Sequence, residues 1–367
     1  MTFEDRLTDI FRRMDERGLD RIVALHNGAH FIEKPDPVLV LTGFKSLGPC
    51  AVVLERSGRT TLVVTPAWDA GRAAEGRPGL RIVAADDVAA GLAGVLNGAG
   101  KTSSVGFAAA PFGIAHRVAQ LVPDAVPADE VVFAAARRKT DTEIANAREA
   151  ARIAELGYRH LLDIARPGIS EDELAAELRW HSKSLGAEDN FVLLCAGPHN
   201  KAVAPSHGRR LQAGDIIVVE LTPSYRGQLV QICRTIAVGA ASDMLRQKYA
   251  LVVEAMHAGI AAAQPGRPMA DVCRAINTML EAEGYGEFCH PPHIRRRGHG
   301  LGFGSIEPGN VALDNQTLLE PDMLFMIHPN QYLPETGYLL CGEPVLMTAR
   351  GAAVLTAQTA TLAEIKL

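Results

Sequence analysis

The sequence predicts an α+β protein with two domains, a smaller α/β domain at residues 1–137 and a larger mixed domain at residues 138–367. A chain of 367 residues is longer than one hydrophobic core usually supports. Its first third alternates short apolar runs with amphipathic stretches, which is typical of an α/β domain. A long helical register begins near Thr140, and strands and turns predominate from Phe191 onward.

The elements of the first domain follow from the spacing of apolar residues. Three stretches predict helices, at residues 6–16, 88–96 and 113–121. Seven short apolar or β-branched runs predict strands, at residues 21–24, 38–41, 51–54, 61–64, 81–84, 104–107 and 130–133.

The second domain is expected to open with two capped helices. Thr140 with Glu143, and Ser170 with Glu173, have the spacing of capping boxes. The first helix ends before residues 166–169, and the second runs to about residue 185. A hairpin-like pair at 215–221 and 229–238 surrounds residues 225–227. Helices at 249–263 and 269–283 and strands at 323–328, 337–347 and 352–355 complete the domain.

Charge and composition limit the partners. Lys plus Arg total 37 against 42 Asp plus Glu, without a block of like charge, so no nucleic acid or acidic lipid partner is expected. The basic run Arg295-Arg296-Arg297 is short enough to be a solvated turn or a local anchor for carboxylates. The chain has neither a signal-type apolar core nor a run of about 20 apolar residues, so a cytoplasmic protein with no membrane partner is expected. Six cysteines without a C-x-x-C pair predict buried thiols.

Five polar positions are expected to converge in one pocket. Inward residues of two antiparallel strands lie about 5 Å apart, so Glu220 and Gln231 can meet across the hairpin. His299 is flanked by glycines that allow close approach. His328 and Glu343 lie on two later strands, and each is followed by proline.

The order of the motifs resembles a known family. The motifs are Gly214 to Glu220, Arg234-Thr235 before Gly239, Gly298-His299-Gly300-Leu301-Gly302, Glu307, Leu319 to Met323, and Gly342-Glu343. Together they are similar to the creatinase, prolidase and methionine aminopeptidase family (M24 type), which has the pita-bread fold. The likeness covers about residues 138–360, and the N-terminal part resembles that of creatinase and the Xaa-Pro peptidases in outline.

The resemblance implies altered metal positions. The peptidases of this family hold two divalent metals on Asp, Asp, His, Glu and Glu, and those places here are Glu220, Gln231, His299, His328 and Glu343. Three of the five ligands differ, and the anionic charge falls by two, so no paired centre and no cofactor is expected. A single Zn, Mn or Fe on Glu220, His299, His328 and Glu343 is the alternative.

Creatinase, which uses this fold without metal, suggests other roles. By that analogy His299 or His328 would shuttle a proton, while Glu343 and Glu220 would hold a cationic group or orient an imidazole. The family's loop histidine is Val203 here, so His199 or His207 is expected to reach the pocket if the loop is re-routed, and otherwise each is an exposed loop residue.

The remaining roles at the candidate site are assigned as follows. His207 is expected to be catalytic, and His199, Gln231, Glu307 and Arg295 are expected to bind substrate. Ile306 occupies the place of the family's second histidine. Cys233 faces the same side as Gln231, but a small buried strand residue explains it better than a nucleophile.

Three functions remain open. The leading hypothesis is a creatinase-like hydrolase or lyase that acts on a C–N bond of a small molecule. The alternatives are an Xaa-Pro aminopeptidase or dipeptidase and a non-catalytic binding module of the same fold. The resemblance also implies a homodimer.

Overall fold

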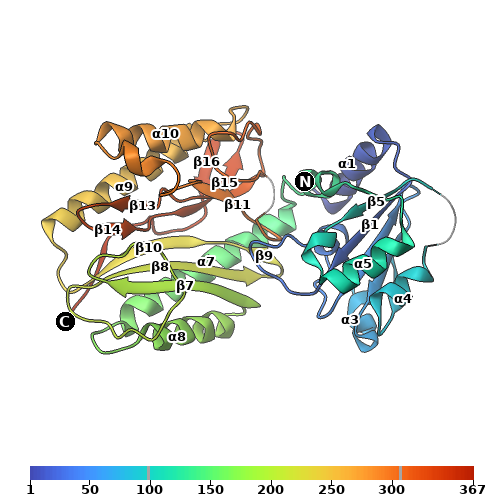
Figure 1. The fold of residues 1–367 in the computed structure, drawn as a ribbon, viewed down its shortest axis with the longest axis horizontal. Helices are drawn as coiled ribbons and strands as arrows, with labels where there is room; N and C mark the ends of the chain where they lie inside the picture. The colour runs from blue at the N-terminus through green and yellow to red at the C-terminus, as the bar shows by residue number, and fades with distance from the viewer. Residues whose placement is uncertain (97–99, 306–307) are drawn as a thin grey trace. The chain divides into compact units, whose positions relative to one another are not determined.

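The computed structural model describes residues 1–96, 100–305 and 308–367, and contacts divide the chain into two compact units. Unit 1 contains residues 1–137 and 303–306, and unit 2 contains residues 138–302 and 307–367. Both units combine helices with sheets (Figure 1).

Unit 1 is built on a six-stranded sheet in the order β4-β3-β2-β1-β5-β6. The strands are β1 Arg21–His26, β2 Cys50–Glu55, β3 Thr60–Val64, β4 Leu80–Ala84, β5 Thr102–Val105 and β6 Val126–Pro127. The helices are α1 Phe3–Glu16, α2 Pro37–Thr42, α3 Ala70–Ala74, α4 Val88–Ala93, α5 Phe112–Leu121 and α6 Asp129–Ala135, with 3-10 turns η1 Ala67–Asp69 and η2 Phe107–Ala109.

Helices cover both faces of this sheet (Figure 1). One core packs α1, α2 and α6 against the strands and includes Ile10, Val40 and Val132. The core on the other face includes Val88 of α4 and Val118 of α5. Strand β1 is antiparallel to β2 and parallel to β5, so the sheet is mixed.

Two predicted strands of unit 1 are helices. Residues 38–41 lie in α2, because the side chain of Asp36 accepts a hydrogen bond from the backbone N–H of Leu39 and Pro37 occupies the first turn. Gly43, with φ 64°, ends this helix. Residues 130–133 lie in α6, whose buried residues face the core at helical spacing. An apolar run of four residues does not distinguish a buried helix from a strand.

Unit 2 contains a five-stranded sheet, a four-stranded sheet and a two-stranded ribbon. The strands are β7 Asp189–Gly197, β8 Ile216–Tyr225, β9 Gln228–Leu229, β10 Ile232–Val238, β11 Gly298–Gly300, β12 Leu324–Ile327, β13 Gln331–Leu333, β14 Gly337–Leu339, β15 Glu343–Thr348, β16 Gly351–Val354 and β17 Ala363–Ile365. The helices are α7 Asp141–Ile164, α8 Glu171–Ser184, α9 Asp243–Ala262 and α10 Met269–Ala282, with the 3-10 turn η3 Gly286–Cys289.

Both predicted capping boxes are present, at Thr140 and Ser170. The sheets of unit 2 lie between two helix pairs, α7 with α8 and α9 with α10 (Figure 1). The two sheets meet where the backbones of Cys233 and Gly342 exchange hydrogen bonds of 3.2 and 3.1 Å. This junction brings β10 and β15 together, and with them the predicted pocket residues.

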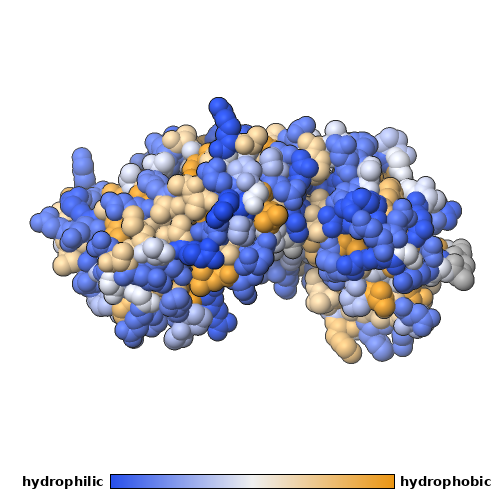
Figure 2. All heavy atoms as spheres, turned by 90° about the horizontal axis from the view of Figure 1, so that it is seen from above, coloured by the Kyte–Doolittle hydropathy of each residue, from blue (hydrophilic) through white to orange (hydrophobic). Residues whose placement is uncertain are grey.

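The surface of the protein is mostly polar, in agreement with the near-equal numbers of acidic and basic residues in the sequence. Figure 2 shows a face on which hydrophilic residues predominate and hydrophobic residues are dispersed among them. Large exposed hydrophobic side chains occur at separate positions, among them Trp68, Phe112 and Trp180. Among the described residues, no helix combines the length and the apolar character needed to cross a membrane.

Candidate functional site

The side chains of Glu220 and Gln231 meet across the β8–β10 hairpin. Glu220 lies on β8, and Gln231 lies one residue before β10. The amide nitrogen of Gln231 donates to Glu220 Oε2 at 3.3 Å and to the Thr222 hydroxyl at 3.2 Å. Both residues are buried, so this contact forms in a setting of low dielectric, where hydrogen bonds to a carboxylate are strong.

His299 continues this hydrogen-bonded chain. It lies at the centre of β11, and its Nε2 is 3.1 Å from Gln231 Oε1. Its Nδ1 is 2.9 Å from the carbonyl oxygen of Gly300. Both ring nitrogens thus face oxygen acceptors, and an imidazolium can donate to both whereas a neutral ring can donate to one. The charge of Glu220 can thus act on the His299 ring through the Gln231 amide.

Two further groups contact Glu220. Asn330 Nδ2 lies 3.4 Å and Cys233 Sγ lies 3.7 Å from Glu220 Oε1. Burial raises the pKa of Cys233 well above its ordinary value, and the charge of Glu220 adds to this effect. The thiol is therefore protonated and acts as a donor, which excludes an activated thiolate at this position.

Glu343 is engaged by a buried ion pair. Its Oε1 is 2.9 Å from the guanidinium of Arg234, and its Oε2 accepts a hydrogen bond of 2.6 Å from the Thr356 hydroxyl. Arg234 also donates to the carbonyl oxygen of Gly342 at 2.8 Å. Burial raises the pKa of Glu343, although Arg234 acts in the opposite direction. These partners hold the carboxylate in a structural role at the junction of the two sheets.

His328 lies beside His299 as a neutral base. The two rings are edge to face with centroids 5.4 Å apart. Burial lowers the pKa of His328 well below its ordinary value, and the neighbouring His299 lowers it further. Among the described residues its Nδ1 has no hydrogen-bond partner. His328 is thus an unprotonated imidazole within the site.

The remaining candidates lie apart from this network. His207 is exposed, and its Nδ1 contacts Glu171 Oε2 at 2.7 Å, so the loop is not re-routed to bring it to the pocket. His199 is also exposed, packs edge to face on Tyr332 and bonds to the carbonyl oxygen of Pro334 at 3.0 Å. Glu307 lies outside the described residues.

The basic run contains one buried residue. Arg297 is 1% exposed and donates to Asn277 Oδ1 at 2.7 Å and to Gln331 Oε1 at 2.9 Å. The expectation of a solvated turn is therefore wrong for Arg297, which anchors the strand leading to His299. Arg295 is exposed and lines a pocket of about 230 Å³ together with Arg296 and Arg297.

Two residues of the site were missed in the sequence. Asn330 was not singled out, although an Asn two residues after His328 is suited to the left-handed φ of 30° that it adopts. Arg234 was noted as part of a motif but not as the partner of Glu343. Residues 109 positions apart in the chain make that pair, and no local signal predicts it.

The donor set does not fit a two-metal centre. Gln231 supplies a neutral amide that is already bonded to Glu220 and His299, and Glu343 is neutralised by Arg234. Across the described ranges, Glu220, His299, His328 and Glu343 do not contribute any group of three ligand atoms within 4.8 Å of one another. Two adjacent dications require bridging carboxylates, which Gln231 and His328 do not supply among the described residues of the site.

Comparisons with known proteins identify a matching family and relatives of this chain. Residues 145–354 match the description Metallopeptidase family M24. An uncharacterized peptidase, YqhT of Bacillus subtilis, is 31% identical over 63% of this chain, and the match spans 65% of that relative's length. The Xaa-Pro dipeptidase of Pyrococcus furiosus is 25% identical over 96% of this chain and 98% of its own length.

A solved structure extends the likeness to the whole chain. The Xaa-Pro dipeptidase from Bacillus anthracis superposes with a TM-score of 0.83 at 23% identity and covers 99% of this chain and 100% of its own. The predicted α+β class, with a smaller N-terminal domain before a pita-bread domain, is confirmed. More than half of the chain matches the family description, and the chain belongs to metallopeptidase family M24.

Proposed function

We propose that this protein is a hydrolase that cleaves an amide C–N bond in a substrate of dipeptide size. Membership of family M24 supports hydrolysis as the reaction class. The relative that matches nearly the whole chain bears the name Xaa-Pro dipeptidase, which supports a peptide amide ahead of the creatine-like bond that the sequence placed first. The Xaa-Pro hypothesis therefore becomes the leading one.

The hydrogen-bonded chain from His299 through Gln231 to Glu220 carries the proposal. Amide hydrolysis adds the oxygen of a water molecule to the carbonyl carbon, breaks the C–N bond and delivers a proton to the departing nitrogen. In this scheme a protonated His299 supplies that proton from Nδ1, which exchanges its contact with the Gly300 carbonyl for the departing nitrogen. Glu220 stabilises the imidazolium through the Gln231 amide, which remains bonded to Nε2. His328, buried and neutral with no hydrogen-bond partner at Nδ1 among the described residues, is the base that this scheme assigns to the proton of the attacking water.

A metal-independent, creatinase-like reaction is the second candidate, because the donor set favours it. Gln231 and His328 are neutral side chains at positions where the family's peptidases use carboxylates. Family M24 consists of metallopeptidases, but the donor set of this chain supports at most one divalent ion.

Other features remain proposals. A contact between the exposed Arg295 and a substrate carboxylate stays a prediction, because the pocket that Arg295 lines does not include His299 or His328 in its lining. The two compact units support the assignment of domains to residues 1–137 and 138–367. A homodimer and a cytoplasmic location stay predictions, the first to be checked by light scattering on the purified protein.

The test compares substrates and metal states on the purified full chain. Gly-Pro and creatine are assayed by product analysis before and after removal of metal with a chelator. We expect cleavage of the dipeptide, and a loss of at least about 100-fold in kcat/KM for His299→Gln. The exposed His257→Gln on α9 is the matched control.

Three outcomes would change the assignment. Turnover of creatine without cleavage of the dipeptide would favour the creatinase-like candidate. Dipeptide cleavage that requires two equivalents of metal would contradict the donor-set argument. If the protein binds Gly-Pro or creatine without turning it over, and His299→Gln binds it with the same affinity, the function is that of a binding module.

A further inference from the structure

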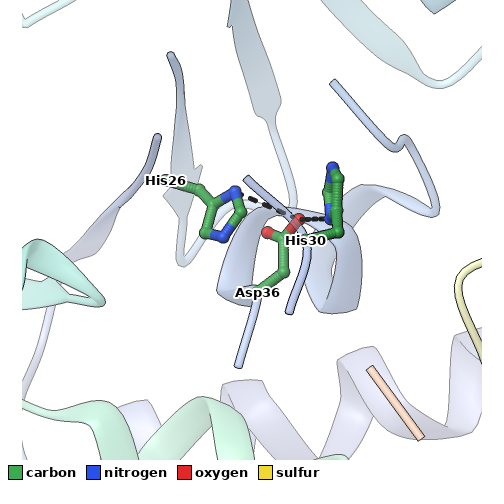
Figure 3. Close-up of side chains that lie close together, drawn as sticks. All are labelled: His26, His30 and Asp36. Carbon is green, nitrogen blue, oxygen red and sulfur yellow. Dashed lines mark ion pairs between the residues drawn. The ribbon is translucent and has the colours of Figure 1, made fainter. Parts of the chain in front are cut away.

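A second cluster of histidine and carboxylate side chains, with His26 and Asp36 buried and His30 partly exposed, lies in unit 1 apart from the residues assigned to the M24 site. His26 ends β1, His30 lies in the following loop, and Asp36 caps α2. Figure 3 shows both rings directed at the Asp36 carboxylate. His26 Nδ1 is 3.3 Å and His30 Nδ1 is 3.2 Å from Asp36 Oδ2.

The hydrogen bonds around the cluster decide where the protons are. The backbone N–H of Gly28 donates to His26 Nδ1 at 3.1 Å, so this nitrogen carries a lone pair and no proton. His30 Nε2 is 3.1 Å from the carbonyl oxygen of Ser46, which only a protonated Nε2 can satisfy. In a neutral His30 the other nitrogen, Nδ1, then carries a lone pair as well.

Three potential ligand atoms therefore converge: Asp36 Oδ2, Nδ1 of a neutral His30, and Nδ1 of His26, whose lone pair accepts the Gly28 N–H in the absence of an ion. Asp36 Oδ1 accepts the Leu39 N–H at 2.9 Å, which fixes the carboxylate and directs Oδ2 at the two rings. Among the described residues Asp36 Oδ2 has no hydrogen-bond partner, so neither ring contact has hydrogen-bond geometry. Asp36 is 3% and His26 0% exposed. A buried carboxylate beside these ring nitrogens is unfavourable unless a cation or a proton lies between them.

The distances indicate which cation fits. Zn²⁺ binds imidazole nitrogen and carboxylate oxygen at about 2.0–2.1 Å, and tetrahedral angles then separate neighbouring ligand atoms by about 3.3 Å. An octahedral ion with the same bond lengths would need about 2.9 Å. The observed 3.2 and 3.3 Å match the tetrahedral value. Ligand atoms of all three residues lie within 4.8 Å of one another.

We propose that His26, His30 and Asp36 bind one Zn²⁺ ion, or a similar tetrahedral transition metal, in the N-terminal unit. Three protein ligands leave the fourth position to water or to another small ligand. The Ser46 carbonyl and the Leu39 N–H would orient His30 and Asp36, as the outer contacts of metal sites commonly do. Because Nδ1 of His26 has a single lone pair, the ion would take the place that the Gly28 N–H holds there. The ion would join the end of β1 to the start of α2 and fix the loop at residues 27–35, part of which lines a pocket of about 550 Å³.

Asp36→Asn is the decisive variant. Asparagine keeps the side-chain oxygen that caps α2, so the helix is retained, while the anionic ligand is lost. His30→Gln tests a ligand whose side chain is 17% exposed and therefore tolerates substitution. Asp87→Asn is the matched control, because Asp87 caps α4 in the same unit in the same way and lies outside the cluster.

The experiment uses the full chain freed of metal by a chelator and titrated with Zn²⁺ and, separately, Co²⁺. We expect one equivalent in wild type, a tetrahedral Co²⁺ absorption spectrum, and a rise in Tm on adding Zn²⁺. Asp36→Asn and His30→Gln should raise Kd by more than about 100-fold and abolish the Tm shift. Asp87→Asn should behave as wild type.

The outcomes also separate this site from the one in unit 2. The double variant Glu220→Gln/His299→Gln should still bind one equivalent of Zn²⁺ in unit 1. Loss of that Zn²⁺ binding in the double variant would overturn the inference. Equal Zn²⁺ affinity in Asp36→Asn and wild type would overturn it as well. Absence of any Zn²⁺ or Co²⁺ uptake by wild type would mean that a proton, shared between His30 and Asp36, balances the carboxylate instead.

Discussion

Arg234 and Glu343 form an ion pair of 2.9 Å with both side chains almost completely buried. The pair joins β10 of one sheet to β15 of the other, next to the backbone hydrogen bonds between Cys233 and Gly342. The sequence led us to expect Glu343 as a ligand or substrate anchor. Its neutralisation by Arg234 instead makes it part of the framework that holds the two sheets of unit 2 together.

Arg234→Met is expected to destabilise the protein strongly. It leaves the Glu343 carboxylate buried without its cation, which costs about 3–5 kcal/mol in the free energy of unfolding. Denaturant unfolding measures the change. Arg246→Met removes the partly exposed Arg246–Glu364 pair and should cost no more than about 1 kcal/mol. Similar losses in the two variants would contradict a structural role for the buried pair.

Local signals in the sequence predicted much of the fold. Both capping boxes and the hairpin turn depend on residues close together in the chain, and Arg226 and Gly227 adopt the positive φ values of 46° and 82° that such a turn requires. Period-2 alternation also predicted that Glu220 and Gln231 would meet. These features need no knowledge of tertiary contacts.

Long-range contacts account for the rest. The Arg234–Glu343 pair and the Asn330–Glu220 hydrogen bond join residues more than 100 positions apart, so spacing could not reveal them. Residues 38–41 form a helix because Asp36 caps it and the core buries it on all sides. The exposed positions of His199 and His207 depend on their contacts with Tyr332 and Glu171.

Cys233→Ser should leave activity within a few fold of wild type. Burial and the nearby carboxylate of Glu220 raise the pKa of the thiol, so no thiolate is available for nucleophilic attack. Serine keeps a hydrogen-bond donor for Glu220. Steady-state kinetics on Gly-Pro measure the effect, and a loss greater than about 100-fold in a folded variant would point to covalent catalysis.

His328 should make stability depend on pH below neutrality. Its folded pKa lies well below 6.5, so from pH 7 downward the unfolded chain gains a proton at this ring before the folded protein does. The free energy of unfolding should therefore fall as pH decreases, by up to about 1.4 kcal/mol per pH unit from this residue. Above about pH 8 the ring is neutral in both states and contributes no slope.

His328→Gln isolates that contribution. Between pH 6.5 and the onset of acid unfolding, the free energy of unfolding of the variant should depend less steeply on pH. The decrease in slope should correspond to the uptake of as much as one proton fewer on unfolding, measured by urea unfolding at several pH values. The exposed His116→Gln should keep the wild-type slope. An unchanged slope in His328→Gln would mean that the ring becomes protonated in the folded protein as readily as in the unfolded chain.

Gln231→Asp is expected to strengthen divalent metal binding in unit 2. The new carboxylate would lie close to Glu220, where the amide now donates a hydrogen bond at 3.3 Å, so two anions would face each other across the hairpin. Their repulsion in a buried site is relieved by a cation. We expect a Kd for Mn²⁺ at least about tenfold lower than in wild type, because one oxygen ligand of the hard type that Mn²⁺ prefers is restored.

Calorimetric titration of Mn²⁺ binding should be done with and without Gln231→Asp in a protein that also carries Asp36→Asn, so that the unit 1 cluster does not contribute. Tight Mn²⁺ binding in unit 2 before the substitution, with no gain after it, would show that Gln231 is not what limits the metal affinity of this site.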